Sequence, residues 1–414
     1  MDVVELRDLG RRLPRFLKRF EGCIKTRPSR KHLRTYVSGQ VSDLERKSVE
    51  PIALAAGVAP RTLQEFLGLH RWDEECLRRR VQQEVQRDFG DANAIGVIDE
   101  TSYAKKGEKT AGVQRQYCGS TGKTDNCVIT VNLGYAANGF HTMIDTDLYL
   151  PEEAWHLDRD RCRRAGIPEE VVYRPKWRIA LELLERSMAN GVQLKHLTAD
   201  EEYGRCGEFR RGVAAMGLTY VVEVPCDTKG WKRPPALLEP EPQAGPGRPR
   251  VRTRLAPEAP APRRVDGLWK RGGPGWEKFR IKDTEKGPVV WKVRAVRFRP
   301  WESGLPGREC WLLVARNVLD GEVKYFLSNA PEDTPVQLML HVAFSRWRIE
   351  RIFQDSKGQV GLDHFEVRNY LSLTRHLILS MVSLLFLMKE TRRLRGEKSL
   401  VEPTPGAHGG RGAA

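Results

Sequence analysis

Two short segments, each predicted to be a buried strand and each followed at once by an aspartate, are the features that most constrain the fold of this chain. Residues 94–98 (AIGVI) precede Asp99, and residues 195–199 (KHLTA) precede Asp200. The first segment is a short apolar run, which predicts a buried strand, and the second is predicted to be a strand as well. Between them, residues 175–190 carry apolar side chains at helical spacing and stop before a glycine, which predicts a helix. We therefore expect a mixed α/β core in which two buried strands each deliver a carboxylate at the C-terminal end.

The rest of the chain divides by composition into segments of different kinds. Residues 1–90 are basic and are predicted to be helical. Residues 228–264 are rich in Pro, Gly and Arg and poor in apolar side chains, which predicts a linker or arm. The tail at 399–414 is rich in Gly and Pro and is predicted to be disordered. Further strands are expected at 126–135, 140–150, 219–224, 289–299, 310–316 and 325–328, and further helices at 204–216, 335–357 and 371–395.

The chain is strongly basic, which bears on its partners. Its 414 residues include 70 Lys and Arg against 54 Asp and Glu, a net charge of +16. Such a surplus favours a polyanion, either nucleic acid or an anionic membrane surface. The N-terminal segment does not resemble a signal peptide, and the longest apolar run, Leu377 to Met388, is too short to cross a bilayer. Nucleic acid is therefore the expected partner, without a membrane.

The cysteines bear on the cellular compartment. All eight are scattered along the chain and none forms a Cys-x-x-Cys pair. This pattern argues against a zinc ribbon and against a disulfide scaffold. We expect a cytoplasmic protein whose reduced thiols mostly serve as small core residues.

Three segments are candidate contacts to nucleic acid, and each has a plainer structural alternative. Residues 51–66 have the pattern of a helix-turn-helix, or equally of an ordinary helical hairpin. Lys105, Lys106 and Arg115 follow the first aspartate closely, and they either bind the DNA backbone or lie on a basic surface hairpin. The residues GRPR at 247–250 are similar to the core of an AT-hook, although a plain linker is the favoured interpretation.

The segment RWRIERIFQDSKG, residues 346–358, carries the most specific pattern. On one helix, Arg346, Glu350 and Lys357 would share a continuous face. A carboxylate between two cations can bind a metal ion while the cations bind neighbouring phosphates. The alternative is a solvated helix face with ordinary ion pairs.

Carboxylates on two strands and a helix suit a pair of magnesium ions. Mg²⁺ prefers oxygen ligands, and two such ions can activate the attacking oxygen and stabilise the leaving oxygen of a phosphoryl transfer. Asp99, Asp200 and Glu350 are the candidate ligands. The neighbours Glu100 and Glu201 are weaker candidates, and no catalytic role is expected of three other acidic residues, Asp145, Asp147 and Asp355.

Residues 346–357 resemble the YREK signature of cut-and-paste DDE transposases from bacterial insertion sequences. Arg346, Glu350 and Lys357 stand at the R, E and K positions, whereas Ala343 stands at the tyrosine position. The segments VIDETS at 97–102 and TADEEYG at 198–204 are similar to those that carry the two catalytic aspartates of the family. The order of aspartate, aspartate, β-rich insertion and glutamate is also that of the family.

The resemblance implies a fold of several parts. An RNase H-like α/β catalytic core is expected over residues 91–227 and 331–398. A linker and β-rich insertion at 228–330 would interrupt this core, and a helical DNA-binding domain at 1–90 would precede it. Asp99, Asp200 and Glu350 would hold two Mg²⁺ ions, for which Mn²⁺ can substitute, and DNA phosphates would be bound by Arg346, Lys357, Lys105, Lys106 and Arg115.

The resemblance also implies an activity. A homodimer in the DNA complex, associated with the bacterial nucleoid, would bind terminal inverted repeats, nick each end and join the freed 3′ ends to target DNA, with or without a hairpin. Two alternatives stay open: an RNase H-like nuclease without strand transfer, and an inactive DNA-binding relative. The second stays open because Ala343 stands at the tyrosine position of the signature.

Overall fold

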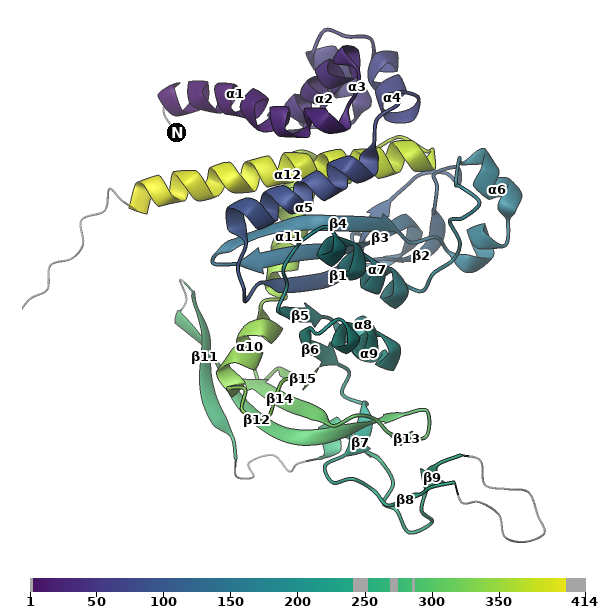
Figure 1. Cartoon of the computed structure of the whole chain (residues 1–414), viewed down its shortest axis with the longest axis vertical. Helices are drawn as coiled ribbons and strands as arrows, with labels where there is room; N and C mark the ends of the chain where they lie inside the picture. The colour runs from purple at the N-terminus through teal and green to yellow at the C-terminus, as the bar shows by residue number, and fades with distance from the viewer. Residues whose placement is uncertain (1–2, 241–251, 269–274, 285–286, 400–414) are drawn as a thin grey trace, which may run out of the picture.

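The computed structural model describes residues 3–240, 252–268, 275–284 and 287–399. The AT-hook-like residues 247–250 and the predicted tail from residue 400 onward lie outside the described residues. The molecule is elongated, with helices from the N-terminal part at one end, the insertion at the other end and the main sheet between them (Figure 1).

Six helical elements come from the first ninety residues; the earlier ones form a layer at one end of the molecule, and the last lies beside the core sheet (Figure 1). The predicted helix-turn-helix corresponds to two of them, joined by a turn in which Gly57 adopts φ +65°. Leu63 and Phe66 of the second helix are fully buried. The elements are α1 Val3–Leu17, the 3-10 helix η1 Lys18–Cys23, α2 Arg27–Gln40, α3 Val49–Ala55, α4 Pro60–Gly68 and α5 Glu74–Phe89.

The long helix α12, Tyr370–Ser399, attaches this layer to the core. His376 Nδ1 lies 2.9 Å from Tyr36 Oη of α2, and Gln40 donates to Ser380 Oγ across 2.8 Å. By length and composition α12 could cross a membrane, but 78% of its apolar window is buried inside the protein. This burial agrees with the predicted buried helix around residues 377–388.

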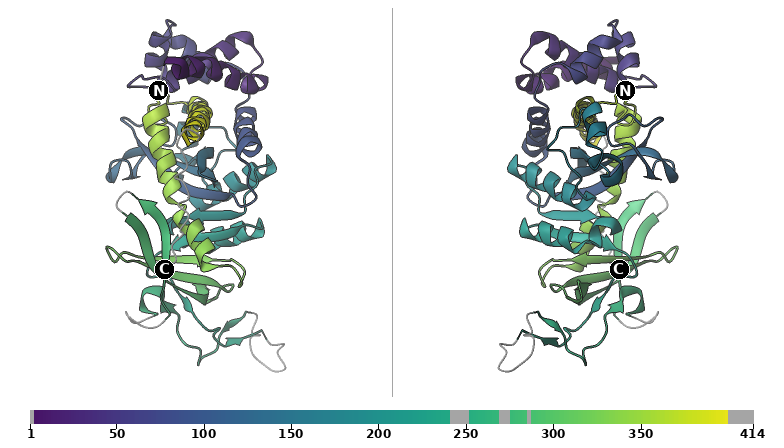
Figure 2. Two further views of the ribbon diagram at one scale, coloured as in Figure 1. Left: turned by 90° about the vertical axis from the view of Figure 1, so that its left-hand side faces the viewer. Right: turned by 90° about the vertical axis from the view of Figure 1, so that its right-hand side faces the viewer.

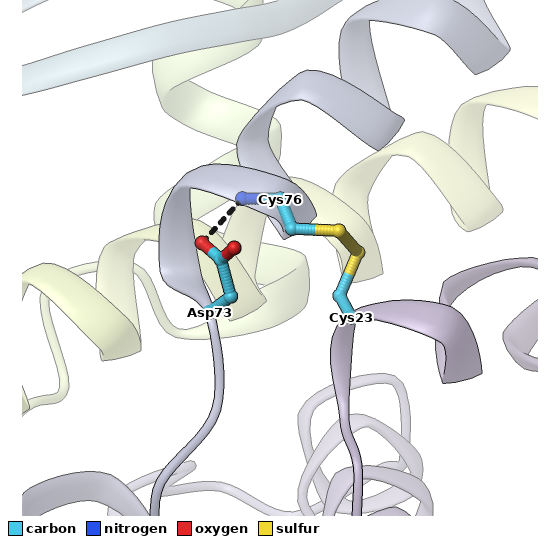
Figure 3. The surroundings of a disulfide bond; sticks show 3 residues. All are labelled: Cys23, Asp73 and Cys76. Atoms are coloured by element: carbon cyan, nitrogen blue, oxygen red, sulfur yellow. Dashed lines mark hydrogen bonds between the residues drawn. A yellow bond between two sulfur atoms is a disulfide. The ribbon is translucent and has the colours of Figure 1, made fainter.

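A disulfide between Cys23 and Cys76 corrects the expectation that all thiols are reduced (Figure 3). It joins the end of η1 to the first turn of α5, where Asp73 Oδ1 accepts a hydrogen bond from Cys76 N at 2.8 Å. The two cysteines are 53 residues apart, so no local spacing could reveal the pair. The other six cysteines are free. Four of these six are buried, as expected, namely Cys118, Cys127, Cys162 and Cys310.

A mixed sheet of 13 strands runs through the described part of the molecule. Within its core part, β1, β5 and β6 are parallel neighbours. β3 is antiparallel to β1, and both β2 and β4 pair with β3. These strands are β1 Ile95–Ala104, β2 Gln114–Cys118, β3 Lys123–Ala137, β4 Phe140–Leu148, β5 His196–Ala199 and β6 Thr219–Val224.

Helices cover both faces of these core strands (Figure 2). α11 lies close to one face because β3 carries Gly134 there: a Cβ at this position would lie 2.9 Å from Ile352 Cδ1 and 3.0 Å from Ile349 Cδ1. The elements after β4 are η2 Glu152–His156, α6 Arg159–Arg164, α7 Lys176–Ala189, α8 Glu201–Gly204, α9 Gly207–Ala215, α10 Val336–Phe344 and α11 Trp347–Val360.

The prediction of a single helix at 335–357 is wrong, because α10 and α11 are separate helices that meet at Ser345 and Arg346. Ser345 Oγ donates to the carbonyl of His341 at 2.7 Å, and a serine that bonds back to its own helix often bends it. Both junction residues keep α-helical dihedral angles. The helix predicted at 204–216 is found as α9, and the short helix α8 precedes it.

The insertion extends the core sheet, because β15 pairs antiparallel with β6. The described part of 228–264, predicted to be a linker, contains the short strands β7 to β10, of which β8 and β9 form a separate pair. The elements are β7 Lys229–Trp231, β8 Leu237–Leu238, β9 Arg254–Leu255, β10 Arg263–Arg264, η3 Val265–Gly267, β11 Glu277–Thr284, β12 Gly287–Glu302, β13 Leu305–Pro306, β14 Cys310–Asn317 and β15 Val323–Ser328.

Candidate active site

The strand register brings Asp99 and Asp200 side by side. β1 and β5 are parallel, and Ile98 is paired with Ala199, so each aspartate directly follows a paired residue. β5 ends before Asp200, as predicted, whereas β1 continues to Ala104 and Asp99 lies in its middle. The expected delivery of a carboxylate at a strand end therefore holds for Asp200 only.

Asp99 and Asp200 are held in an environment that opposes two negative charges. Burial, reinforced by the nearby Asp200, raises the pKa of Asp99 to about 7. Burial also raises the pKa of Asp200. Asp200 caps α8, where its Oδ1 accepts hydrogen bonds from the backbone N–H groups of Glu202 at 3.0 Å and Tyr203 at 3.4 Å. Two such carboxylates repel each other when both are ionised, and a bound cation removes that repulsion.

Arg346 lies between several carboxylates. Its Nη1 donates to Asp99 Oδ2 at 3.2 Å, and its Nη2 lies 3.4 Å from Glu350 Oε1. Its Nε is 3.8 Å from Glu223 Oε2. The guanidinium that was predicted to bind phosphate is thus engaged by acidic side chains in this structure.

Glu350 is connected to the aspartates through Arg346. Its side chain is 64% exposed, and it lies on α11 at the edge of two clefts. Among the described residues, no group of three or more His, Cys, Asp or Glu side chains is arranged to hold a metal ion. The structure therefore brings Asp99 and Asp200 together, whereas Glu350 is separated from them by the side chain of Arg346. The donors themselves are carboxylate oxygens, the type that Mg²⁺ prefers.

The predicted phosphate-binding cations fall into two groups. Lys357 lies near the site, with its Nζ 3.2 Å from the carbonyl of Ser102 on β1. Lys105 is turned away, because its Nζ donates to the carbonyls of Asp363 at 3.2 Å and Phe365 at 2.7 Å. Lys106 and Arg115 are exposed.

The position of the family tyrosine is filled by apolar packing. Ala343 is buried, at 3% exposure. The neighbouring ring of Phe344 packs 4.8 Å from the ring of Trp291 and 5.7 Å from that of Phe326. Phe344 is therefore part of the contact between α10 and the insertion.

The sequence analysis did not identify Glu223, although it lies beside the site. The register of β5 and β6 pairs Leu197 with Tyr220, so Glu223 stands in line with Asp200 on the next strand. Its side chain is 11% exposed, and Lys324 Nζ donates to its Oε1 at 2.8 Å. The available signal was a single charged residue in the otherwise apolar strand TYVVEV.

The acidic residues that were ranked lower have other partners. Glu100 Oε1 accepts from Lys176 Nζ at 2.6 Å. Asp145 is fully buried and pairs with Arg186 at 2.8 Å and with Arg78. Asp355 pairs with Arg351 at 3.0 Å along α11. Asp145 thus joins α5 and α7 to β4, and Asp355 forms an ion pair within α11.

Comparison with known proteins adds two findings. The family model described as "DDE superfamily endonuclease" matches residues 19–288. A protein of Microchaete diplosiphon described as "Probable transposase for insertion sequence element IS701" is 32% identical over 188 residues, which is 45% of this chain and 46% of that protein. The match thus spans about half the length of that relative. The family match includes Asp99 and Asp200 and ends before Glu350.

Proposed function

Because the chain belongs to the DDE superfamily of endonucleases, we propose that it is a transposase that cuts DNA at the ends of a mobile element and joins the freed ends to target DNA. The observation that carries this proposal is the pair of buried carboxylates, Asp99 and Asp200, on adjacent parallel strands. The relative described as a probable insertion-sequence transposase supports the same activity.

The core is proposed to be RNase H-like. The strand order β4, β3, β1, β5 and β6 combines antiparallel and parallel neighbours. Helices cover both faces (Figure 2). This arrangement supports the fold that the resemblance implies, with the insertion entering between β6 and α10. The helices of residues 1–90, including the α3–α4 pair, are proposed to bind DNA, and the net charge of +16 supports a DNA partner.

Asp99, Asp200 and Glu350 are the residues that would hold two Mg²⁺ ions. Such ions supply a polarised phosphoryl oxygen and an activated attacking oxygen. The donor set fits, because the buried aspartates carry raised pKa values and repel each other. Glu350 is exposed, and its contact to Arg346 is 3.4 Å long, so exchange of that contact would let it turn toward the aspartates. Arg346, once released, would be free to bind a DNA phosphate.

The test is a set of charge-neutral variants. Asp99→Asn, Asp200→Asn and Glu350→Gln should each lower Mg²⁺-dependent nicking of a duplex carrying the DNA that flanks the reading frame, by roughly a hundred- to a thousandfold. DNA binding in a gel-shift assay should persist. Glu185→Gln on α7, 48% exposed, is the matched control and should cleave normally. Full cleavage by Asp99→Asn would overturn the proposal.

Two further assays separate the alternatives. Pre-cut ends incubated with plasmid DNA should yield joined products, whereas a nuclease without strand transfer gives none. An inactive DNA-binding relative would show no metal-dependent nicking with either Mg²⁺ or Mn²⁺. A homodimer is proposed only for the DNA complex, and light scattering with and without the duplex tests that state.

A further inference from the structure

The single helical turn that follows Asp200 is held at both of its ends. Asp200 caps the start of α8 by accepting hydrogen bonds from the backbone N–H groups of Glu202 and Tyr203. Carbonyl groups in the last turn of a helix have no partner within the helix, and Arg210 Nη1 donates to that of Gly204 at 2.5 Å. Because α8 is only four residues long, a shift of its last residue is passed on to the aspartate that caps it.

Arg210 joins this turn to the insertion. Its Nη2 donates to Oε1 of Glu302, the last residue of β12. The side chains are 6% exposed for Arg210 and 22% exposed for Glu302, so the pair is largely shielded from water, where a charge-assisted hydrogen bond is strong. Gly207, the first residue of α9, leaves room for the carboxylate, because a Cβ there would lie 3.0 Å from Glu302 Oε1. The end of β12 is therefore packed closely against the start of α9.

The next residue, Arg211, binds the same carboxylate in a different setting. Its Nη1 donates to Glu302 Oε2 at 2.5 Å, but its side chain is 58% exposed. It also pairs with Glu208 at 3.7 Å, on α9 itself. Of the two neighbouring arginines, Arg210 thus connects Glu302 to α8, whereas Arg211 binds Glu302 from the solvent side. The pair therefore offers a matched comparison, since both carry the same charge and share one partner.

We propose that Glu302 and Arg210 are positioning residues for Asp200. Glu302 of the insertion holds Arg210, Arg210 holds the end of α8, and α8 fixes the direction of the carboxylate that caps it. The proposal rests on the proposed function, in which Asp200 binds a metal ion. A group that orients a metal ligand contributes about ten- to a hundredfold to metal affinity. The insertion thereby supports metal binding by the core, although neither Glu302 nor Arg210 is a ligand.

The experiment measures Mn²⁺ binding by the full chain without DNA, from the loss of the electron paramagnetic resonance signal of free Mn²⁺. Arg210→Gln should weaken binding by about ten- to a hundredfold. Glu302→Gln, a change at a partly exposed side chain, should weaken it in the same direction. Arg210→Lys keeps the charge and hydrogen-bond donors and should recover part of the loss. Arg211→Gln makes the same change of charge beside Arg210, and as the control it should bind Mn²⁺ like wild type.

Nicking at increasing Mg²⁺ separates positioning from a loss of folded protein. Positioning predicts that Arg210→Gln needs more Mg²⁺ for half-maximal nicking, whereas a loss of folded protein lowers the maximal rate and leaves that concentration unchanged.

Equal Mn²⁺ affinities of Arg210→Gln and wild type would overturn the proposal, as would an equal loss in Arg211→Gln. Failure of the positioning role is distinguishable from failure of the proposed function. In the first case Asp200→Asn weakens Mn²⁺ binding and Arg210→Gln does not. In the second case Asp200→Asn binds Mn²⁺ like wild type and nicks normally.

Discussion

Arg346 Nη1 lies 3.2 Å from Asp99 Oδ2 and joins the start of α11 to the middle of β1, across 247 residues of sequence. The arginine lowers the pKa of Asp99 against the larger effects of burial and of Asp200, which raise it. It thus partly neutralises the aspartate pair in the protein without metal. A divalent cation bound to Asp99 and Asp200 would take over that role.

Replacing Arg346 by Gln should therefore destabilise the metal-free protein and increase its response to metal. The contact is partly exposed, at 24% for Arg346 and 14% for Asp99, so we expect a loss of about 1–2 kcal/mol at pH 8 rather than the full value of a buried pair. Thermal unfolding with and without Mg²⁺ measures both effects. Arg351→Gln, which breaks the Asp355 pair on the same helix, is the control. Equal Mg²⁺-induced shifts in wild type and Arg346→Gln would contradict this coupling.

Gly204 is expected to tolerate no side chain. A Cβ there would lie 1.8 Å from the carbonyl oxygen of Glu223, and no rotamer change can relieve a clash with backbone. Gly204→Ala should cost about 1–3 kcal/mol of unfolding free energy and lower nicking, because α8, which Asp200 caps, must move. Urea unfolding checks the stability. Gly358→Ala on α11, where nothing lies within 4 Å, should be neutral or stabilising. Equal stabilities of the two variants would refute the steric argument.

The burial of His376 predicts that the folded protein loses stability in mild acid. It is fully buried, and burial lowers its pKa from 6.5 to about 4. Between these two values the unfolded chain binds a proton that the folded protein does not, so stability falls as the pH falls from 6.5 to 4. The contribution of this one group amounts to about 3 kcal/mol at most. Urea unfolding across this pH range should show that the unfolding free energy depends less on pH in His376→Asn than in wild type. The same pH dependence in both proteins would contradict this role of His376.

The Cys23–Cys76 disulfide should stabilise the helices that it encloses. A loop of 53 residues, containing α2, α3 and α4, loses conformational entropy in the unfolded state that corresponds to about 4 kcal/mol. Reductant should therefore lower the unfolding temperature of wild type. The double variant Cys23→Ser, Cys76→Ser should have that lower temperature from the start and no response to reductant. A wild-type protein indifferent to reductant would show that the bond contributes little.

Local sequence patterns were sufficient to predict the helices and strands whose apolar side chains repeat regularly. The apolar run before Asp99 predicted β1, because burial of a short strand leaves a short apolar run, and the segment before Asp200 was correctly predicted to be the strand β5. The break at Ser345 was not predictable, since the apolar spacing continues through it. Glu223 and the disulfide were missed for a related reason: each depends on register or packing between segments far apart in sequence, which local spacing does not encode.

The third carboxylate of the site is the remaining question, because Glu223 and Glu350 both lie near Arg346. Glu223 is 8% exposed and already receives a hydrogen bond from Lys324 at 2.8 Å. Glu350 is exposed at the junction of two clefts. We therefore expect Glu350 to be the metal ligand and Glu223 to position Arg346.

Substitutions by glutamine and cysteine should separate these two roles. Glu223→Gln keeps a hydrogen-bonding side chain and should lower nicking by about tenfold, the lower end of the range for a group that orients others. Glu350→Gln should lower it far more. A thiolate binds Mg²⁺ poorly and softer metals better, so Mn²⁺ should partly restore nicking by Glu350→Cys and should not favour Glu223→Cys. Rescue of Glu223→Cys alone would transfer the ligand role to Glu223, because only a side chain in contact with the metal can change which metal supports the reaction.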